Sequence, residues 1–298
     1  LYSCVDDQDS VMIPKDITRI GDGAFAGCRD LTAITIPDNV TSIGRGVFSR
    51  CEFLDSITLP DSITSIGEKA FWRCSGLTSI TIPDHVTHIE RETFAECERL
   101  ANVIIPEGVT NIGEKAFRWC TRLTSITIPE SVVKIDCSAF AFCYRLTSIT
   151  IPAGVTRIEK YTFHCCMNLT DVVLPEGVTS IGLLAFAGCH ELTNVVLPAS
   201  LVSIERRAFA DCRSLSSITI PEGVTRLESG AFSQCSELTD IAIPDSVTSI
   251  GDLAFAWCGK LKSVVLPTSV TDIGDRIFWG CTDLADESGL VIMHRTLY

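Results

Sequence analysis

The chain has 298 residues, of which 46% are apolar and 20% charged, and its mean hydropathy is +0.30. This composition supplies ample apolar material for a folded core and excludes a disordered chain. The net charge of −13 argues against a nucleic-acid-binding protein, which needs clustered basic residues, and no apolar run reaches the ~20 residues of a membrane-spanning helix.

The twelve prolines reveal an internal repeat. Each lies 23 residues after the one before it. They are Pro14, Pro37, Pro60, Pro83, Pro106, Pro129, Pro152, Pro175, Pro198, Pro221, Pro244 and Pro267. Such a fixed period is the mark of a stacked repeat protein, so the chain has to be interpreted by columns of equivalent residues.

Other residue types recur at the same period, without an insertion or deletion. Leucine recurs from Leu31 to Leu284, phenylalanine from Phe25 to Phe278 and cysteine from Cys28 to Cys281, and further apolar columns begin at Ala24, Ile34, Ile36, Val40 and Ile43. About eight apolar columns per repeat predict one continuous core shared by neighbouring turns.

The spacing within a repeat predicts its local structure. In the segment L-T-S-I-T-I-P, apolar and polar residues alternate as in a strand, and the proline ends that strand because it cannot donate a ladder hydrogen bond. The segment V-T-S-I-G predicts a second short extended or turning piece. In A-F-x-x-C the inward residues lie at i, i+1 and i+4, which favours a single helical or 3₁₀ turn.

These elements predict an α/β repeat solenoid, with a parallel sheet on one face and short helical or 3₁₀ turns on the other. At ~4.8 Å between strands, twelve turns would extend roughly 55–60 Å. We expect one domain over residues 1–284, made of twelve 23-residue repeats and a degenerate N-terminal half-turn, and an end segment or cap over 285–298. The apolar tail 289–298 is expected to pair as an end strand or half of a hairpin.

The ends of the chain carry two further expectations. Leu1, Tyr2 and Val5 lie 23 residues before a later Ala, Phe and Cys, which predicts the half-turn. The chain begins at Leu1, without a methionine or a charged-then-apolar leader, and we expect it to be a cut or processed piece.

The column set L-x-x-I-x-I-P-x-x-V-T-x-I-G-x-x-A-F-x-x-C resembles the BspA-like class of leucine-rich repeats over residues 1–284. It differs from the commoner plant and animal consensus, which has an asparagine ladder and lacks both this proline and A-F-x-x-C. The resemblance implies a leucine-rich-repeat horseshoe or gently curved solenoid. It also implies a cell-surface or secreted protein of anaerobic bacteria or parasitic protists, which adheres to host proteins or other cells and has no shared catalytic residues.

Twelve of the fifteen cysteines form the column that accompanies the phenylalanines. Neighbouring members point the same way from successive turns, which is poor geometry for a disulfide. We interpret them as a ladder of small buried hydrophobic side chains and expect all twelve to be reduced. Reduced buried thiols suit a cytosolic or an anaerobic setting, so cysteine usage leaves the compartment open.

Two histidine-containing clusters are weak candidates for metal or redox chemistry. His164 precedes the vicinal pair Cys165 and Cys166, which lacks a third or fourth ligand nearby, and His85 and His88 form the one paired-histidine motif. A surface loop is the better interpretation of the histidine pair. The chain has no G-x-S-x-G nucleophile motif, no phosphate-binding glycine loop and no HExxH, so we predict no enzyme, no cofactor and no metal site.

The outward positions of the predicted strands are mostly serine and threonine, which suits a solvated face with high strand propensity. The exception on consecutive turns is a strip in which Val173 and Val196 replace threonine, while Asp171 and Asn194 replace serine. Ile104 is an isolated apolar replacement. An apolar strip with polar neighbours is a candidate partner-binding surface.

A second candidate surface lies on the predicted turn side. Trp119 and Phe142 occupy the position before the column cysteine on consecutive turns, and Tyr144 is close in sequence. Stacked exposed aromatic side chains are enriched at interfaces, although these rings could equally be covered by their neighbours. The remaining tryptophans occupy similar positions singly, at Trp72, Trp257 and Trp279.

The sequence thus favours a non-enzymatic recognition or adhesion module, cell-surface or secreted, that binds a protein partner and neither binds nucleic acid nor inserts into a membrane. Two alternatives stay open: a structural spacer that projects another domain, and an intracellular scaffold.

Overall fold

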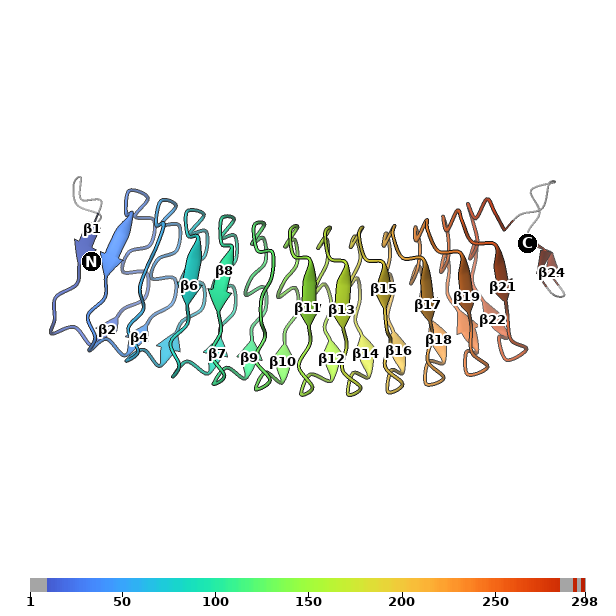
Figure 1. Cartoon of the computed structure of the whole chain (residues 1–298), viewed down its shortest axis with the longest axis horizontal. Coiled ribbons are helices and arrows are strands. Elements are labelled where there is room, and N and C mark those ends of the chain that lie inside the picture. The colour runs from blue at the N-terminus through green and yellow to red at the C-terminus, as the bar shows by residue number, and fades with distance from the viewer. Residues whose placement is uncertain (1–9, 285–291, 294–295, 298) are drawn as a thin grey trace. The chain divides into compact units, whose positions relative to one another are not determined.

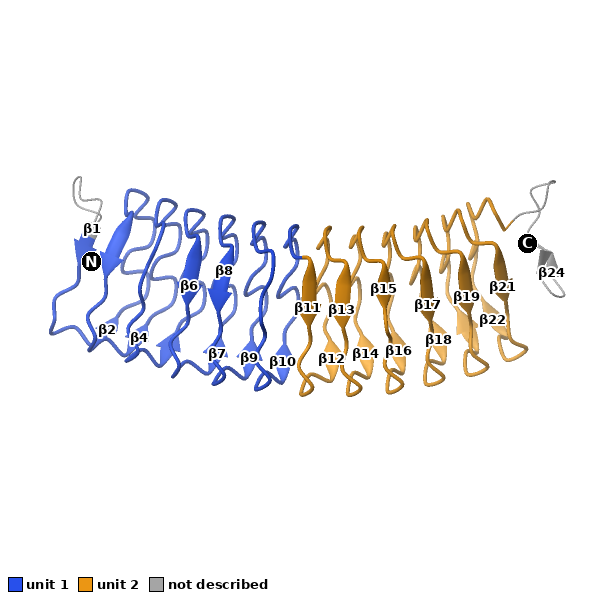
Figure 2. Cartoon of the chain, viewed as in Figure 1, with its two compact units in different colours: residues 1–146 blue, residues 147–298 orange. Residues whose placement is uncertain are grey.

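The computed structural model describes residues 10–284, 292–293 and 296–297. The chain divides into two compact units, Leu1–Leu146 and Thr147–Tyr298 (Figure 2). Each unit is a stack of 23-residue turns carrying two series of short parallel strands, which Figure 1 shows as two rows. The single domain expected over residues 1–284 stays a prediction.

In unit 1 the first series comes from the L-x-x-I-x-I segment and the second from the segment after each proline. The first series comprises β1 (Ser10–Met12), β3 (Ala33–Thr35), β6 (Ser79–Thr81) and β8 (Asn102–Ile104). The second comprises β2 (Arg19–Ile20), β4 (Ser42–Ile43), β5 (Ser65–Ile66), β7 (His88–Ile89), β9 (Asn111–Ile112) and β10 (Lys134–Ile135). The pairs β1–β3 and β6–β8 and the sheets β2-β4-β5 and β7-β9-β10 are all parallel.

Unit 2 repeats this plan. Its first series comprises β11 (Ser148–Thr150), β13 (Asp171–Val173), β15 (Asn194–Val195), β17 (Ser217–Thr219), β19 (Asp240–Ala242) and β21 (Ser263–Val265). Its second comprises β12 (Arg157–Ile158), β14 (Ser180–Ile181), β16 (Ser203–Ile204), β18 (Arg226–Leu227), β20 (Ser249–Ile250) and β22 (Asp272–Ile273), joined in one six-stranded sheet. The first series forms the parallel sheets β11-β13-β15 and β17-β19-β21.

The strand predictions are confirmed, because paired strand residues occupy equivalent positions of successive repeats, as Ser148 and Asp171 do. In β11 the central Ile149 is buried and its two neighbours are exposed, which is the alternation that one buried sheet face requires. At the C-terminal end, β23 (Ile292–Met293) pairs antiparallel with β24 (Thr296–Leu297), in agreement with the expected hairpin. The residues on which the predicted N-terminal half-turn rests, Leu1, Tyr2 and Val5, lie outside the described residues.

The helical or 3₁₀ turn expected at A-F-x-x-C is wrong: no helix occurs among residues 10–284, and this segment forms consecutive β-turns. Around Phe71, the N–H groups of Lys69, Phe71 and Arg73 donate to carbonyls of the next turn, at 2.9–3.0 Å. Only the intervening N–H groups, those of Ala70 and Trp72, donate to carbonyls within their own turn. A helix would need every N–H to bond within its own segment, so alternate bonding to the next turn excludes one.

The same segment contains two residues per repeat with left-handed backbone angles. In this repeat φ is +58° at Lys69 and +61° at Arg73. Each occupies the third position of a β-turn, where a type II turn requires positive φ. The residues with positive φ prevent the backbone from continuing as a right-handed helix, and their side chains lie on the outside of the turn face.

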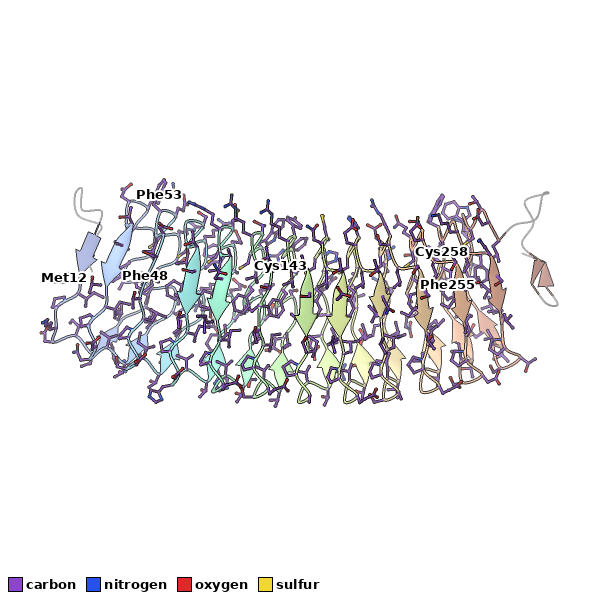
Figure 3. The ribbon with its side chains drawn as sticks, in the orientation of Figure 1. Met12, Phe48, Phe53, Cys143, Phe255 and Cys258 are labelled. Carbon is purple, nitrogen blue, oxygen red and sulfur yellow. The ribbon has the colours of Figure 1, made fainter. Side chains whose placement is uncertain are left out.

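The core is built from the apolar columns, with the phenylalanines at its centre. Within each unit successive rings stack with centroids 5.3–5.7 Å apart. Phe48 and Phe255 are two of these buried rings (Figure 3). Each ring contacts the equivalent ring of the next turn, so the core is continuous within a unit and a single turn cannot bury it alone.

Replacing a core ring should therefore destabilise the protein according to its position in the stack. Phe117 has a stacked ring on each side, and Phe117→Ala should lower the free energy of unfolding by about 3–5 kcal/mol. Phe25 is only half-buried, and Phe25→Ala should cost less. Thr127→Ala, on the exposed sheet face, should change stability by no more than about 0.5 kcal/mol in urea denaturation. Equal effects of Phe117→Ala and Thr127→Ala would contradict this description of the core.

Candidate functional site

The valine strip, defined as Val173 and Val196 with the flanking Asp171 and Asn194, lies on the first-series sheet of unit 2. Strands β13 and β15 pair in register, with Asp171 opposite Asn194. Val173 is 58% exposed and Val196 71% exposed. The hydroxyl of Thr170 donates to Asp171 Oδ2 at 2.7 Å, which orients the carboxylate at one edge of the strip. The structure thus brings the four strip residues together on two adjacent turns.

Ile104 stands alone on the corresponding face of unit 1. It ends β8 and is 62% exposed, while the equivalent residues one turn before and after, Thr81 and Thr127, are polar and exposed. Because it has no apolar neighbour in its column, Ile104 does not form a patch comparable with the valine strip.

The aromatic residues predicted on the turn side of unit 1 form a self-packed cluster. Trp119 stacks on Phe142 with centroids 4.4 Å apart, and Tyr144 meets Trp119 edge-on at 5.4 Å. The guanidinium of Arg118 lies 5.2 Å from the centre of the Phe142 ring. All three aromatic side chains are half-buried, because each ring covers part of the next.

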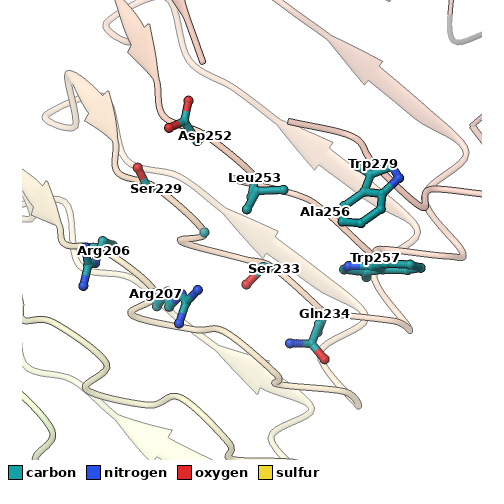
Figure 4. A pocket seen from close by; sticks show the side chains of 11 residues that line it. Arg206, Arg207, Ser229, Ser233, Gln234, Asp252, Leu253, Ala256, Trp257 and Trp279 are labelled. Carbon is teal, nitrogen blue, oxygen red and sulfur yellow. The ribbon is translucent and has the colours of Figure 1, made fainter. Parts of the chain in front are cut away.

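The sequence predictions missed a third site, a hollow of about 400 Å³ on the turn face of unit 2, here called the tryptophan hollow. Figure 4 shows Arg207 on one side of it and Trp257 and Trp279 on the other, with Ser233 and Gln234 between them. Trp257 is 50% exposed and Trp279 51% exposed. The ring centroids of the two tryptophans lie 4.8 Å apart.

The two tryptophans occupy different columns, so the column pattern presents them as isolated residues. Trp257 precedes a column cysteine, whereas Trp279 follows a column phenylalanine. On the turn face, hydrogen-bonded neighbours are separated by one residue less than the repeat period, and the Trp257 N–H donates to the Trp279 carbonyl at 2.6 Å. A search for residue pairs at this shorter spacing would have found the pair.

The column cysteines form a hydrogen-bonded ladder within each unit. In unit 1 the Cys74 thiol donates to the Phe48 carbonyl at 3.0 Å, and in unit 2 the Cys189 thiol donates to the Phe163 carbonyl at 3.2 Å. Burial raises the pKa of the Cys143 thiol from 9.0 to about 12, against a smaller lowering effect from the backbone at Cys120. Thiols whose pKa is raised in this way, as that of Cys143 is, are protonated at neutral pH and chemically inert.

One expectation about the cysteines is wrong, since Cys28 is disulfide-bonded. The other eleven column cysteines, Cys51 to Cys281, carry thiols, so the disulfide does not join two column members and the geometric argument holds for these eleven. Cys28 differs from the interior positions because it lies at the N-terminal end of the column and keeps 8% exposure, whereas Cys51 is fully buried.

The histidine clusters do not assemble a metal site. His85 and His88 are exposed on the surface of unit 1. His164 Nε2 lies 3.6 Å from the Cys165 sulfur, and burial, with a smaller contribution from Asp211, raises the pKa of that thiol, which disfavours the reactive thiolate. No group of three or more His, Cys, Asp or Glu side chains within the described part of the chain could hold a metal ion.

The pattern of columns matches a known family model. The model of the BspA type leucine rich repeat region matches in six copies, with matched segments at residues 1–121, 65–171, 87–205 and 156–285. The chain belongs to this family. Leucine-rich-repeat proteins are in general non-enzymatic binding modules and typically bind proteins. No curated protein sequence matches the chain.

Several solved structures are similar. A leucine-rich cell surface protein from Faecalibacterium prausnitzii is 35% identical, with 90% of this chain and 79% of that chain covered and a TM-score of 0.56. A leucine-rich repeat protein from Bacteroides ovatus is 26% identical, with 93% and 77% covered and a TM-score of 0.67. The pneumococcal vaccine antigen PcpA, 23% identical with 89% and 74% covered and a TM-score of 0.59, shares the fold. In the described part of this chain, no helix is long and apolar enough to cross a bilayer.

The buried thiols predict how stability depends on alkaline pH. Because the folded state raises the pKa of Cys143 from 9.0 to about 12, the unfolded chain releases this proton near pH 9 while the folded chain keeps it. The contribution of this thiol to the free energy of unfolding is therefore complete below pH 9. As the pH rises from 9 toward 12, the free energy of unfolding falls by about 1.4 kcal/mol per pH unit for each such thiol.

Urea denaturation from below pH 9 to about pH 11 measures this slope. Cys143→Ala removes one titrating thiol, so the free energy of unfolding of this variant should fall less steeply with pH, by about 1.4 kcal/mol per pH unit. The packing lost in the variant lowers its stability equally at every pH and leaves this difference in slope unchanged. Identical slopes for the two proteins would contradict the shifted pKa.

Proposed function

We propose that this chain is a non-enzymatic protein-recognition or adhesion module of the cell surface, which binds a protein partner through the valine strip. The family supports a binding role, and the F. prausnitzii relative is described as a cell surface protein. The observation that carries the choice of surface is the exposure of Val173 and Val196 on consecutive turns of one sheet.

Within the described turns of unit 2, the strip is the place in its column where valine occurs on two consecutive turns, since the exposed Val265 follows Ala242. The preceding and following turns of unit 2 carry exposed threonines, Thr150 and Thr219, at the equivalent position. Valine lacks the hydroxyl that lets threonine bond water, so two adjacent exposed valines leave apolar surface that a partner can cover. The polar edge formed by Asp171 and Asn194 would fix the orientation of the bound partner, because a carboxylate that becomes buried needs a hydrogen-bond donor from that partner.

The backbone beneath the strip is held rigidly. The Ile151 N–H donates to the Val173 carbonyl at 3.1 Å, and Val172 lies opposite Val195 in the parallel ladder. Valine side chains are also stiff at χ1. A partner would therefore order few groups on binding, which favours affinity per unit of buried area. The partner that fits is a protein surface with an apolar side chain over the valines and a hydrogen-bond donor toward Asp171.

The test adds two charges to the strip. The double variant Val173→Lys/Val196→Lys should keep the melting temperature, because both side chains point to solvent, and should abolish adhesion to epithelial cells and to immobilised extracellular-matrix proteins. The matched control is Ala242→Lys/Val265→Lys, which adds the same charges to the same column on two consecutive turns that do not adjoin the strip and should bind as the unchanged protein does.

Two results would contradict the proposal. If adhesion survives in the valine variant but is lost in Trp119→Ala/Phe142→Ala, the binding surface is the aromatic cluster of unit 1. If neither variant alters adhesion, or the unchanged protein adheres to nothing, the chain acts as a spacer that presents another domain.

A further inference from the structure

The tryptophan hollow lies on the turn face of unit 2, where equivalent positions of successive turns hold first a large residue, then small ones, and then a large one again. Arg207 occupies the first left-handed position of its turn, and the equivalent residue of the next turn is Gly230. Ser233 and Ala256, both small, follow the column phenylalanines on the floor of the hollow, whereas Trp279 holds that position one turn later. A Cβ at Gly230 would lie 3.0 Å from Arg207 Cγ and 3.6 Å from Arg207 Nε, so the arginine side chain lies over this glycine at the edge of the hollow.

The tryptophans are fixed in their exposed positions. Besides the backbone hydrogen bond to Trp279, the Trp257 ring packs directly over Gly280, where any Cβ would overlap the ring. The two indoles are tilted by 52° to each other, and the guanidinium of Arg276 lies 5.3 Å from the centre of the Trp279 ring. Packing thus supports one side of each indole and leaves half of its surface open to solvent.

The hollow is lined by positively and negatively charged side chains. Arg206 and Arg207 are exposed, and neither forms an ion pair with a described residue. Asp252 is an exposed residue and accepts a hydrogen bond from the Asp275 N–H through Oδ1 at 2.8 Å. Gln234 adds an exposed amide, with one acceptor and two donor hydrogens, beside Trp257.

We infer that the tryptophan hollow binds an acidic saccharide, that is, a pyranose that carries a carboxylate. The C–H face of the sugar ring stacks on the indole of Trp257. The carboxylate pairs with the guanidinium of Arg207, a charge-assisted and geometrically selective contact. The ring hydroxyls donate to Asp252 and exchange hydrogen bonds with Gln234.

This ligand class follows from three demands that the hollow makes together. An anion complements Arg207, a hydrogen-bond donor complements Asp252, and a flat apolar surface complements Trp257. A simple anion offers nothing to Asp252 or Trp257, and a neutral sugar lacks the charge that complements Arg207. The hollow, at about 400 Å³, lies at the lower end of the range of small-molecule sites, about 300–1,000 Å³, and is large enough for a single sugar residue and its substituents.

The experiment is a titration of the chain with 3′-sialyllactose and with glucuronic acid, each compared with its neutral counterpart, lactose or glucose. Isothermal titration calorimetry gives the affinity, and tryptophan fluorescence reports on the ring. We expect saturable binding of an acidic saccharide, weaker by about tenfold for the neutral counterpart, as the loss of one charge-assisted pair implies. Trp257→Ala should weaken binding by about tenfold or more, and Arg207→Gln should remove the preference for the acidic ligand.

A blocking variant tests the space itself. Gly230→Glu adds a carboxylate at the edge of the hollow and cancels its net positive charge, and because the new Cβ would lie 3.0 Å from Arg207 Cγ, the arginine side chain has to shift. The backbone conformation is one that glutamate adopts in this chain, since Glu92 occupies the equivalent position at φ +55°. It should abolish saccharide binding. Gly46→Glu places the same residue at the same position of a turn in unit 1, where φ is +60°, and should bind normally.

The inference is overturned if none of the acidic saccharides binds saturably, if Trp257→Ala and Gly230→Glu bind as the unchanged protein does, or if lactose and sialyllactose bind equally. The valine variant Val173→Lys/Val196→Lys should retain saccharide binding, so the failure of this inference and the failure of the proposed adhesive strip are separate results.

Discussion

Each turn of this protein depends on its neighbours to satisfy its backbone hydrogen bonds. On the turn face, N–H groups bond alternately within their own turn and to a carbonyl of the next turn, while on the strand faces equivalent residues of successive repeats pair. Buried backbone groups without partners are costly, so the repeat length is held constant through twelve repeats. The same bonding pattern excludes a helix at A-F-x-x-C and requires left-handed angles at two positions per turn.

The left-handed positions connect this constraint to the candidate surfaces of the turn face. Among the residues that the structure describes, eighteen other than glycine adopt positive φ, each at a cost of order 1–3 kcal/mol that the surrounding hydrogen bonds must offset. Trp119, Phe142, Arg207 and Trp257 are among them. Side chains at these positions project outward from a fixed backbone, so the turn face displays large residues in defined orientations. These residues can differ from one repeat to the next because they do not pack in the core.

The two faces of unit 2 offer different chemistry from one scaffold. The strand face displays the valine strip, an apolar surface with one carboxylate edge, which suits a protein. The turn face displays the tryptophan hollow, in which aromatic, cationic and anionic groups converge on a volume suited to a small polar ring. Both depend on rigid ladders, which lower the entropy lost on binding. The two proposed sites therefore differ in chemistry while the core columns beneath them stay the same.

The sequence by itself determined the repeat, the strands and the apolar columns, because a fixed period and strand alternation are visible along the chain and each column must face the core. It also placed the valine strip, since in a parallel ladder equivalent residues of successive repeats are neighbours. Tertiary structure alone decided the turn conformation, because the bonds that replace a helix there connect separate turns. It likewise decided that Trp119 and Phe142 cover each other and that Trp257 meets Trp279, because the turn face pairs residues at a spacing one short of the repeat period, which the column pattern conceals.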